Sequence, residues 1–415
     1  MNPAYQNIFT LAKAAILRQA PEDIHTPVDW TETIDLLRRG KLQGIVYKTA
    51  SELPDESRPE PGFLNGWKVD SFRNGFKQLA STQEVRRVIE AANKQNLYPI
   101  LFKGLILAAL YPEPSMRYSS DADMFIPENQ RPAMEELLIS LGYIKILEAS
   151  KEHVPVYHIN KENQYLTIEL HDCLWEDYTG AQAEVLHSLD FTNPDTLLEL
   201  SPFGFPIHTL GHEEHLAYQV FHIAKHFAFE GMRLRFLTDI TLFVNAYKDQ
   251  INFEHFWQSM NKLGYCEFCG AMFKICNTYL GMTDSVLKPE HAVLPINKQL
   301  LADIVLAGKI GEHQTENWAS TDMLAAYFMR ENKASSGIKR KLEIFFPMPS
   351  ELKDKFSYAK KYPILLPIAW IHRFFSAARY SILCKLKKQS ASDVLSNAEY
   401  RLSLMKSVGL VDEKK

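Results

Sequence analysis

Asp121 and Asp123 stand one residue apart at the start of an apolar segment, and their carboxylates are the groups in this chain best placed to do chemistry. Successive side chains of a β-strand point to opposite faces, so both carboxylates are expected on one face of a strand, about 6–7 Å apart. Two carboxylates at that spacing can converge on a pair of divalent cations, which stabilise the attacking and leaving oxygens of a phosphoryl displacement. The spacing therefore predicts a metal-dependent phosphoryl or nucleotidyl transfer site.

A short apolar run upstream ends in Lys103 and Gly104, where a strand is expected to turn into a helix. A helix N-terminus presents free N–H groups and partial positive charge, which suit a triphosphate, and Gly104 lets the backbone approach it. Lys103 is expected at the same phosphates or, alternatively, as an exposed turn residue, because lysine is rarely buried. We expect Arg117, Ser119 and Ser120, just before the aspartates, to reach phosphate oxygens.

A later predicted strand carries Glu169 and His171 on one face and apolar Ile168 and Leu170 on the other. An adjacent place in the sheet would put Glu169 beside the two aspartates as a third carboxylate. His171 would orient Glu169 or a phosphate; the alternative is a hydrogen-bonded core histidine. Acidic pairs are also common on solvated strand faces, so the prediction depends on these neighbouring residues.

The elements that must position these side chains alternate between strand and helix. Strands are expected at 98–102, 121–126, 143–147, 154–159 and 165–171, with helices at 104–110 and 128–141. Strand, helix, strand, helix and then a meander indicates a small α+β core with a mixed sheet.

Helical patterns flank this core on both sides. We divide the chain into an N-terminal helical region (1–97), the α+β core (98–205), a helical substrate or cap domain (206–338) and a basic, aromatic C-terminal extension (339–415). The clearest helix of the third part should bury a stripe made of Leu216, Val220, Ile223 and Phe227.

Composition narrows the class of protein. A hydrophobic content of 46% and a charged content of 23% are those of a globular protein, and a net charge of −4 gives no support for DNA as a partner. The N-terminal segment lacks the pattern of a secretory signal, and the longest strongly apolar run, 363–371, is shorter than the ~20 residues that span a bilayer. Five cysteines suit a reducing compartment, so we expect a cytoplasmic protein.

The motifs also carry a resemblance. Lys103-Gly104, an apolar helix, Arg117 and the pair Asp121-x-Asp123, with Glu169 downstream, resemble the uncharacterised bacterial nucleotidyltransferase family of the polymerase-beta-like superfamily. The resemblance covers roughly 30–375, is strongest at 101–126 and 165–171, and includes His226 and the segment 234–239.

The resemblance implies that Asp121 and Asp123 bind two Mg²⁺ ions, one holding a nucleoside triphosphate and one lowering the pKa of the acceptor hydroxyl. It implies that Glu169 completes the second metal site and acts as base, and that Gly104 and its neighbours contact the β- and γ-phosphates. The superfamily usually has Gly-Ser or Gly-Gly in this turn, where this chain has Lys103-Gly104, and many relatives have Asp in place of Glu169.

The expected reaction is transfer of a nucleoside monophosphate, most simply from ATP, to a hydroxyl acceptor, with release of pyrophosphate. One alternative is a non-catalytic nucleotide-binding module that acts as a regulator or partner subunit. Another keeps the chemistry but makes the acceptor a protein or a transfer RNA.

Two further groups of residues have competing interpretations. The histidines His212, His215, His222 and His226 are favoured as packed or surface residues, with a substrate phosphate contact from His226 or Lys225 as the alternative. Arg235 and Asp239, four residues apart on a helix, are most simply an intrahelical ion pair, whereas Arg233 and Arg235 could also line the cleft.

The cysteines Cys266, Cys269 and Cys276 are favoured as free buried residues rather than zinc ligands, because no second ligand pair follows at a suitable spacing. The segment 353–388 is basic and aromatic. It is interpreted as a helix packed on the protein or, alternatively, as a surface for an anionic membrane or a polyanionic acceptor.

Overall fold

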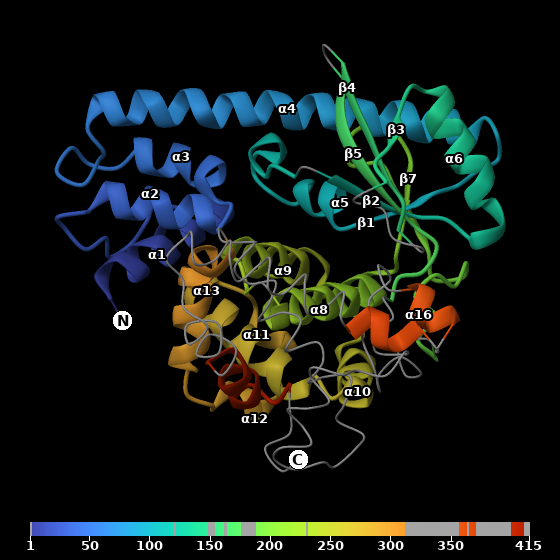
Figure 1. Ribbon diagram of the computed structural model, residues 1–415. Helices are drawn as coiled ribbons and strands as arrows, with labels where there is room; N and C mark the ends of the chain where they lie inside the picture. The colour runs from blue at the N-terminus through green and yellow to red at the C-terminus, as the bar shows by residue number, and fades with distance from the viewer. Residues whose placement is uncertain are drawn as a thin grey trace.

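The computed structural model (Figure 1) describes residues 2–119, 121–147, 154–161, 164–175, 188–229, 231–311, 357–362, 365–370 and 400–410. Ser120 and most of the basic segment 353–388 lie outside the described residues. Within the described ranges, none of the helices is long and apolar enough to cross a membrane.

A seven-stranded mixed sheet forms the centre of the α+β core, in the strand order β3-β4-β5-β2-β1-β7-β6. Its strands are β1 (Ile100–Phe102), β2 (Asp121–Phe125), β3 (Ile144–Lys145), β4 (Val156–Lys161), β5 (Gln164–His171), β6 (Leu198–Leu200) and β7 (Ile207–Thr209). The predicted fold class, with strands at all five expected places, is confirmed.

Strands β6 and β7 are missing from the sequence-based prediction. Each has three residues, too few to show an alternating pattern. Strand β7 lies beyond the expected boundary at residue 205 and pairs in parallel with β1, so the sheet continues past that boundary.

The sheet has two chemically different faces because its strands alternate. Ala122 and Met124 of β2 pack with Ile168 and Leu170 of β5 in one apolar cluster, which also holds residues of the helices behind the sheet. Phe102 points to the opposite face and joins the large core of the helical domain. Since the acidic residues alternate with the members of the first cluster, they lie on this second face.

Helices lie on both sides of the sheet (Figure 1). They are α1 (Pro3–Leu17), α2 (Trp30–Arg39), α3 (Gln43–Ser51), α4 (Pro61–Asn93), α5 (Gly104–Ala108), α6 (Arg131–Ser140), α8 (His212–Phe229), α9 (Leu234–Tyr247), α10 (Phe253–Leu263), α11 (Cys266–Leu280), α12 (Pro289–Ala292), α13 (Lys298–Gly311) and α16 (Ser357–Lys361). The predicted helix at 128–141 opens as a 3₁₀ turn at Glu128–Gln130 and ends before Gly142, whose φ of 90° suits glycine.

The long helix α4 joins two parts of the molecule. Figure 1 shows it running above α3 at one end and behind the strands at the other, and it contacts both α3 and β5. On the opposite side of the sheet, α8 and α9 supply the helical wall, and the stripe predicted for α8 is fully buried. Helix α1 packs on α9 and α11, so the N-terminal helices and the helical domain share one core.

Candidate active site

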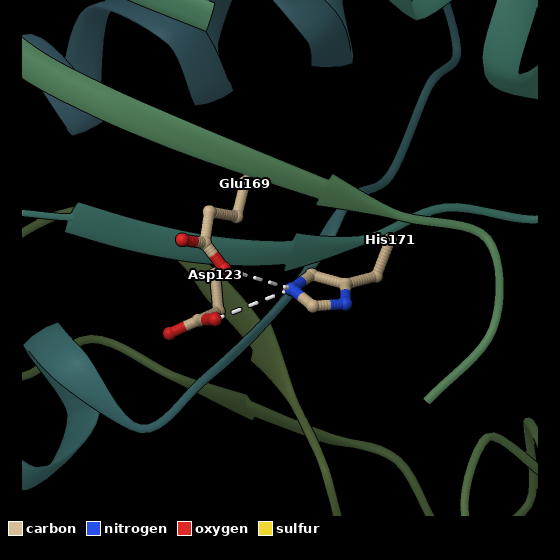
Figure 2. A group of neighbouring side chains, drawn as sticks. All are labelled: Asp123, Glu169 and His171. Atoms are coloured by element: carbon tan, nitrogen blue, oxygen red, sulfur yellow. Dashed lines mark hydrogen bonds and ion pairs between the residues drawn. The ribbon is translucent and has the colours of Figure 1, made fainter. Parts of the chain in front are cut away.

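The three predicted carboxylates share one face of the sheet. Strands β2 and β5 are parallel neighbours, and their register places Asp123 directly opposite Glu169. Figure 2 shows both carboxyl groups turned toward the imidazole of His171, and ligand atoms of these three residues all lie within 4.8 Å of one another. Asp121 is two residues along β2, on the same face and partly exposed. Asp123 and Glu169 therefore meet from two separate segments, with Asp121 farther along the same face, and the use of all three as metal ligands stays a prediction.

Asp123 is buried and doubly contacted. Its Oδ1 lies 2.9 Å from the Lys103 ammonium nitrogen and 3.2 Å from His171 Nε2. Burial by itself would raise the pKa of Asp123, but Lys103 and then His171 lower it well below its usual range. Asp123 is therefore ionised and ready to ligate a cation at neutral pH.

Glu169 differs from Asp123 in its electrostatic surroundings. Its side chain is 38% exposed, and Oε2 lies 3.8 Å from His171 Nε2. Burial, then Asp123, then Asp121 raise the pKa of Glu169. Repulsion from the two aspartates makes the ionised form of Glu169 less favourable. A bound cation would stabilise this ionised form, because its positive charge offsets the repulsion among the three carboxylates.

Lys103 occupies an unusual backbone conformation at the end of β1. Its φ of 63° and ψ of −129° lie where glycine is favoured over residues with a side chain. The Lys103 N–H donates to Nε2 of buried His215 at 3.1 Å, which ties the turn to α8. The ammonium lies 5.4 Å and 5.5 Å from the ring centres of Phe102 and Tyr218. Lys103 is thus largely buried, and the alternative of an exposed turn residue is wrong.

Arg117 has a different role from the one predicted. Its Nε and Nη2 donate to the two carboxylate oxygens of Asp239 at 3.0 Å and 2.7 Å, and Nη1 donates to the Gly104 carbonyl at 3.0 Å. Tyr111 also donates to Asp239, at 2.7 Å. Because all three guanidinium nitrogens of this buried residue are used, Arg117 joins the sheet to α9 instead of reaching for phosphate oxygens.

The partnership of Asp239 also corrects the helix ion pair expected on α9. Asp239 gives both oxygens to Arg117, so Arg235 does not form the predicted pair with it. Arg235 Nη1 donates to the Tyr118 carbonyl at 2.8 Å, while its buried Nε has no hydrogen-bond partner. Asp239 therefore pairs with a residue more than a hundred positions away in the sequence, and not with the arginine one turn earlier on its own helix.

Ser119 braces the first aspartate. Its hydroxyl donates to Asp121 Oδ1 at 2.9 Å, and its backbone N–H donates to Gln78 Oε1 of α4 at 2.8 Å. A phosphate contact from Ser119 stays a prediction.

A cleft of about 180 Å³ lies between the sheet and the helical wall. Its sheet side carries the pair Asp121 and Asp123, while its helical side is basic. Besides Lys103, Gly104, Arg117 and Ser119, the other residues that line the cleft are Lys41, Leu107, Tyr118, Gln219, His222, Ile223, His226, Arg233, Arg235, Phe236 and Asp239. Lys41 and Gln219 were missed from the sequence, because an isolated lysine in a turn and a glutamine on an amphipathic helix carry no recognisable signal.

The remaining histidines and cysteines behave as packed residues. His222 and His226 contact each other through Nε2 at 3.1 Å, and burial lowers the pKa of His222 well below its usual value. Neither joins a cluster of three potential metal ligands among the described residues. Cys266, Cys269 and Cys276 are free thiols, as predicted, but only Cys269 and Cys276 are buried, whereas Cys266 is partly exposed.

The residues present fit a divalent cation. Carboxylate oxygens suit Mg²⁺ or Mn²⁺, and Asp123 and Glu169 offer such oxygens from a face that also carries Asp121. His171 contacts both carboxylates and can orient them.

Comparison with known proteins agrees with this geometry. A family model described as uncharacterised nucleotidyltransferase matches residues 26–281, which include both acidic strands. No curated protein matches the chain.

The chain is also similar to three solved structures. The crystal structure of ANT(2")-Ia in complex with adenylyl-2"-tobramycin is 15% identical over 44% of this chain and 97% of that one, with a TM-score of 0.32. An antigenic nucleotidyltransferase-like protein from Paracoccidioides brasiliensis is 15% identical over 51% of this chain and 95% of that one, with a TM-score of 0.33. With the family model matching more than half of its residues, the chain belongs to the uncharacterised nucleotidyltransferase family.

Proposed function

We propose that the protein transfers a nucleoside monophosphate from ATP to a hydroxyl acceptor in a reaction that depends on Mg²⁺. The observation that carries this proposal is the meeting of Asp123 and Glu169 on paired strands, with Asp121 on the same face. The hydroxyl oxygen forms a bond to the α-phosphorus, the bond to the bridging oxygen breaks, and pyrophosphate leaves.

Asp121, Asp123 and Glu169 are the residues that would hold two Mg²⁺ ions. When bound, the ions would supply positive charge beside the attacking and leaving oxygens. Asp123 is kept ionised by Lys103 and His171, so the site can accept a cation without first losing a proton. Among Asp123, Glu169 and His171, which contact one another, Glu169 has the most exposed side chain. It is our candidate for the base that takes the hydroxyl proton.

The turn at Lys103 and Gly104 is the proposed contact for phosphate oxygens near the acidic residues, together with Ser119 and Ser120. Lys103 and Gly104 both line the cleft, and the ammonium is already held beside Asp123. His171 would hold the Asp123 carboxylate in one orientation through its 3.2 Å contact. Arg117 is not part of this proposal, because its guanidinium is bound to Asp239.

The acceptor and its setting are proposed only by class. We propose a cytoplasmic bacterial enzyme whose acceptor carries a hydroxyl and is not DNA. The segment 353–388 would dock on an anionic membrane surface or a polyanion. A protein or transfer RNA acceptor and a non-catalytic nucleotide-binding module remain defined alternatives that the following experiment separates.

In the experiment, wild type, Asp121→Asn and Asp123→Asn are each incubated with labelled ATP, Mg²⁺ and cell lysate as the source of acceptor. Pyrophosphate release and transfer of label to a product are measured. Each variant should lose transfer by at least about a thousandfold, since each removes a charge that cations require. Asp70→Asn is the matched control, because Asp70 is an exposed residue on α4, outside the cleft, and should change nothing.

Transfer retained in Asp123→Asn would contradict the assignment of the site. Metal-dependent ATP binding by wild type without pyrophosphate release would favour the non-catalytic module. Label on a protein or RNA band would identify a macromolecular acceptor, whereas label on a small product would exclude one.

A further inference from the structure

Three cations from two distant segments face the cleft from its helical side. Lys41 lies in the turn between α2 and α3, and Arg233 and Arg235 lie at the start of α9. The Arg235 N–H donates to the Gly40 carbonyl at 3.1 Å, so the two segments are joined next to these side chains. The N-terminal helices thus contribute a residue to the active-site cleft.

Lys41, Arg233 and Arg235 form no ion pair with a carboxylate among the described residues. Asp239 is paired with Arg117, and Asp121 acts on Lys41 and Arg235 only from beyond ion-pair distance. Partial burial, then Arg233 and Arg235, lower the pKa of Lys41, whose side chain sits at the exposed rim. Burial and then Arg117 lower the pKa of Arg235 to about 10. Like charges held this close are unfavourable unless an anion joins them.

Two buried polar groups in the same cleft also lack partners. Gln219 is 4% exposed, and neither its amide nitrogen nor its amide oxygen makes a hydrogen bond. The buried Nε of Arg235 is likewise unused. Buried polar groups are nearly always paired, so unsatisfied donors beside uncompensated cations indicate a missing anionic ligand with acceptor oxygens.

We propose that Lys41, Arg233 and Arg235 form a phosphate-binding subsite, with Gln219 as an additional hydrogen-bond donor. Guanidinium groups bind phosphate oxygens in a fork, and Lys41 adds a point charge at the rim. The phosphate belongs either to the triphosphate tail of the nucleotide, which becomes pyrophosphate, or to a phosphorylated acceptor. Only this choice of source rests on the proposed nucleotidyl transfer.

The test is calorimetric titration of the full-length protein with inorganic pyrophosphate in EDTA, so that no metal ion mediates binding. Wild type should bind, and Lys41→Gln and Arg233→Gln should each weaken the affinity about tenfold, the usual effect of losing one charged hydrogen-bond donor. Arg73→Gln is the matched control, since it removes an exposed arginine of α4 that does not line the cleft, and should leave the affinity unchanged.

An affinity unaltered by both Lys41→Gln and Arg233→Gln would overturn the proposal, as would the absence of pyrophosphate binding by wild type. Arg235→Lys keeps the charge but not the fork, and it should weaken binding less than Lys41→Gln does. Circular dichroism of each variant would show that the fold is retained.

A second titration distinguishes the two sources of phosphate. Pyrophosphate binding that is abolished by a saturating non-hydrolysable ATP analogue with Mg²⁺ would assign the subsite to the triphosphate tail. Binding that persists beside the analogue would assign it to a phosphorylated acceptor. Because the first titration needs neither nucleotide nor metal, it stays readable even if wild type releases no pyrophosphate from ATP.

Discussion

Arg117 and Arg235 line the same cleft, but they differ in their electrostatic partners. Arg117 is 3% exposed and forms a two-point ion pair with Asp239, plus a bond to the Gly104 carbonyl. The Arg235 side chain lies near other cations, donates one hydrogen bond, to the Tyr118 carbonyl, and leaves Nε unused. The sequence predicts Arg117 at the phosphates and favours an ion pair for Arg235, with a position in the cleft as the alternative, and the structure agrees with that alternative.

The contrast separates charges that hold the fold from charges that await a ligand. A buried cation with a carboxylate partner is structural, and removing one member leaves the other charge buried alone. A cation among like charges costs stability in the free protein, and this cost is recovered only when an anion binds.

The largest effect is expected for Arg117→Met. It leaves Asp239 as an uncompensated buried charge, which should lower the free energy of unfolding by about 3–5 kcal/mol. Urea denaturation at pH 7 measures the change. The double variant Arg117→Met/Asp239→Leu removes both charges and should recover most of the loss. A single variant within 1 kcal/mol of wild type would show that the pair is not structural.

His215 gives the paired region a pH dependence. Burial, then His212 and Lys103, lower the pKa of His215 to about 3, below its ordinary 6.5. Because the folded state binds this proton more weakly than the unfolded state does, protonation of His215 lowers the free energy of unfolding. The contribution of neutral His215 is complete above pH 6.5 and is lost as the pH falls toward 3. Between pH 7 and pH 5 the loss should be about 2 kcal/mol.

The measurement for His215 is urea denaturation at pH 7 and at pH 5. His215→Gln is the comparison, because its amide oxygen can still accept from the Lys103 N–H but does not titrate. Its free energy of unfolding should fall by about 2 kcal/mol less than that of wild type over this interval. Equal falls in both proteins would contradict the assignment.

The strained turn at Lys103 is testable with two truncations. Lys103→Gly and Lys103→Ala both remove the ammonium from Asp123, but only alanine retains a Cβ at a φ of 63°. Glycine should therefore be the more stable variant by about 1 kcal/mol in thermal or urea unfolding. Greater stability for alanine would show that the turn relaxes out of this conformation.

The smallest effect is expected for Arg235→Met, and it completes the comparison with Arg117. Losing the bond to the Tyr118 carbonyl costs about 1 kcal/mol, while relief from the neighbouring cations offsets it. The free energy of unfolding should stay within about 1 kcal/mol of wild type. A loss as large as that of Arg117→Met would remove the distinction between the two arginines.

The core elements could be predicted because each has a strong local pattern. The alternation Asp121-Ala122-Asp123-Met124 predicts which side chains lie on the polar face of the strand and which lie on the apolar face. The same holds for Glu169 and its apolar neighbours. Strands β6 and β7 could not be found in this way, since β7 is placed by its pairing with β1, and β6 by its pairing with β7, and not by local pattern.

Sequence alone determined which side chains share a strand face and hence where acidic chemistry is available, because strand geometry repeats every two residues. Only the tertiary structure decided which charge meets which. Asp239 pairs with Arg117 and not with Arg235 on the same helix, and Lys41 lines the cleft although it belongs to the N-terminal helical region. Charge pairing depends on distance through space and on burial, and neither quantity is encoded in the spacing of residues along the chain.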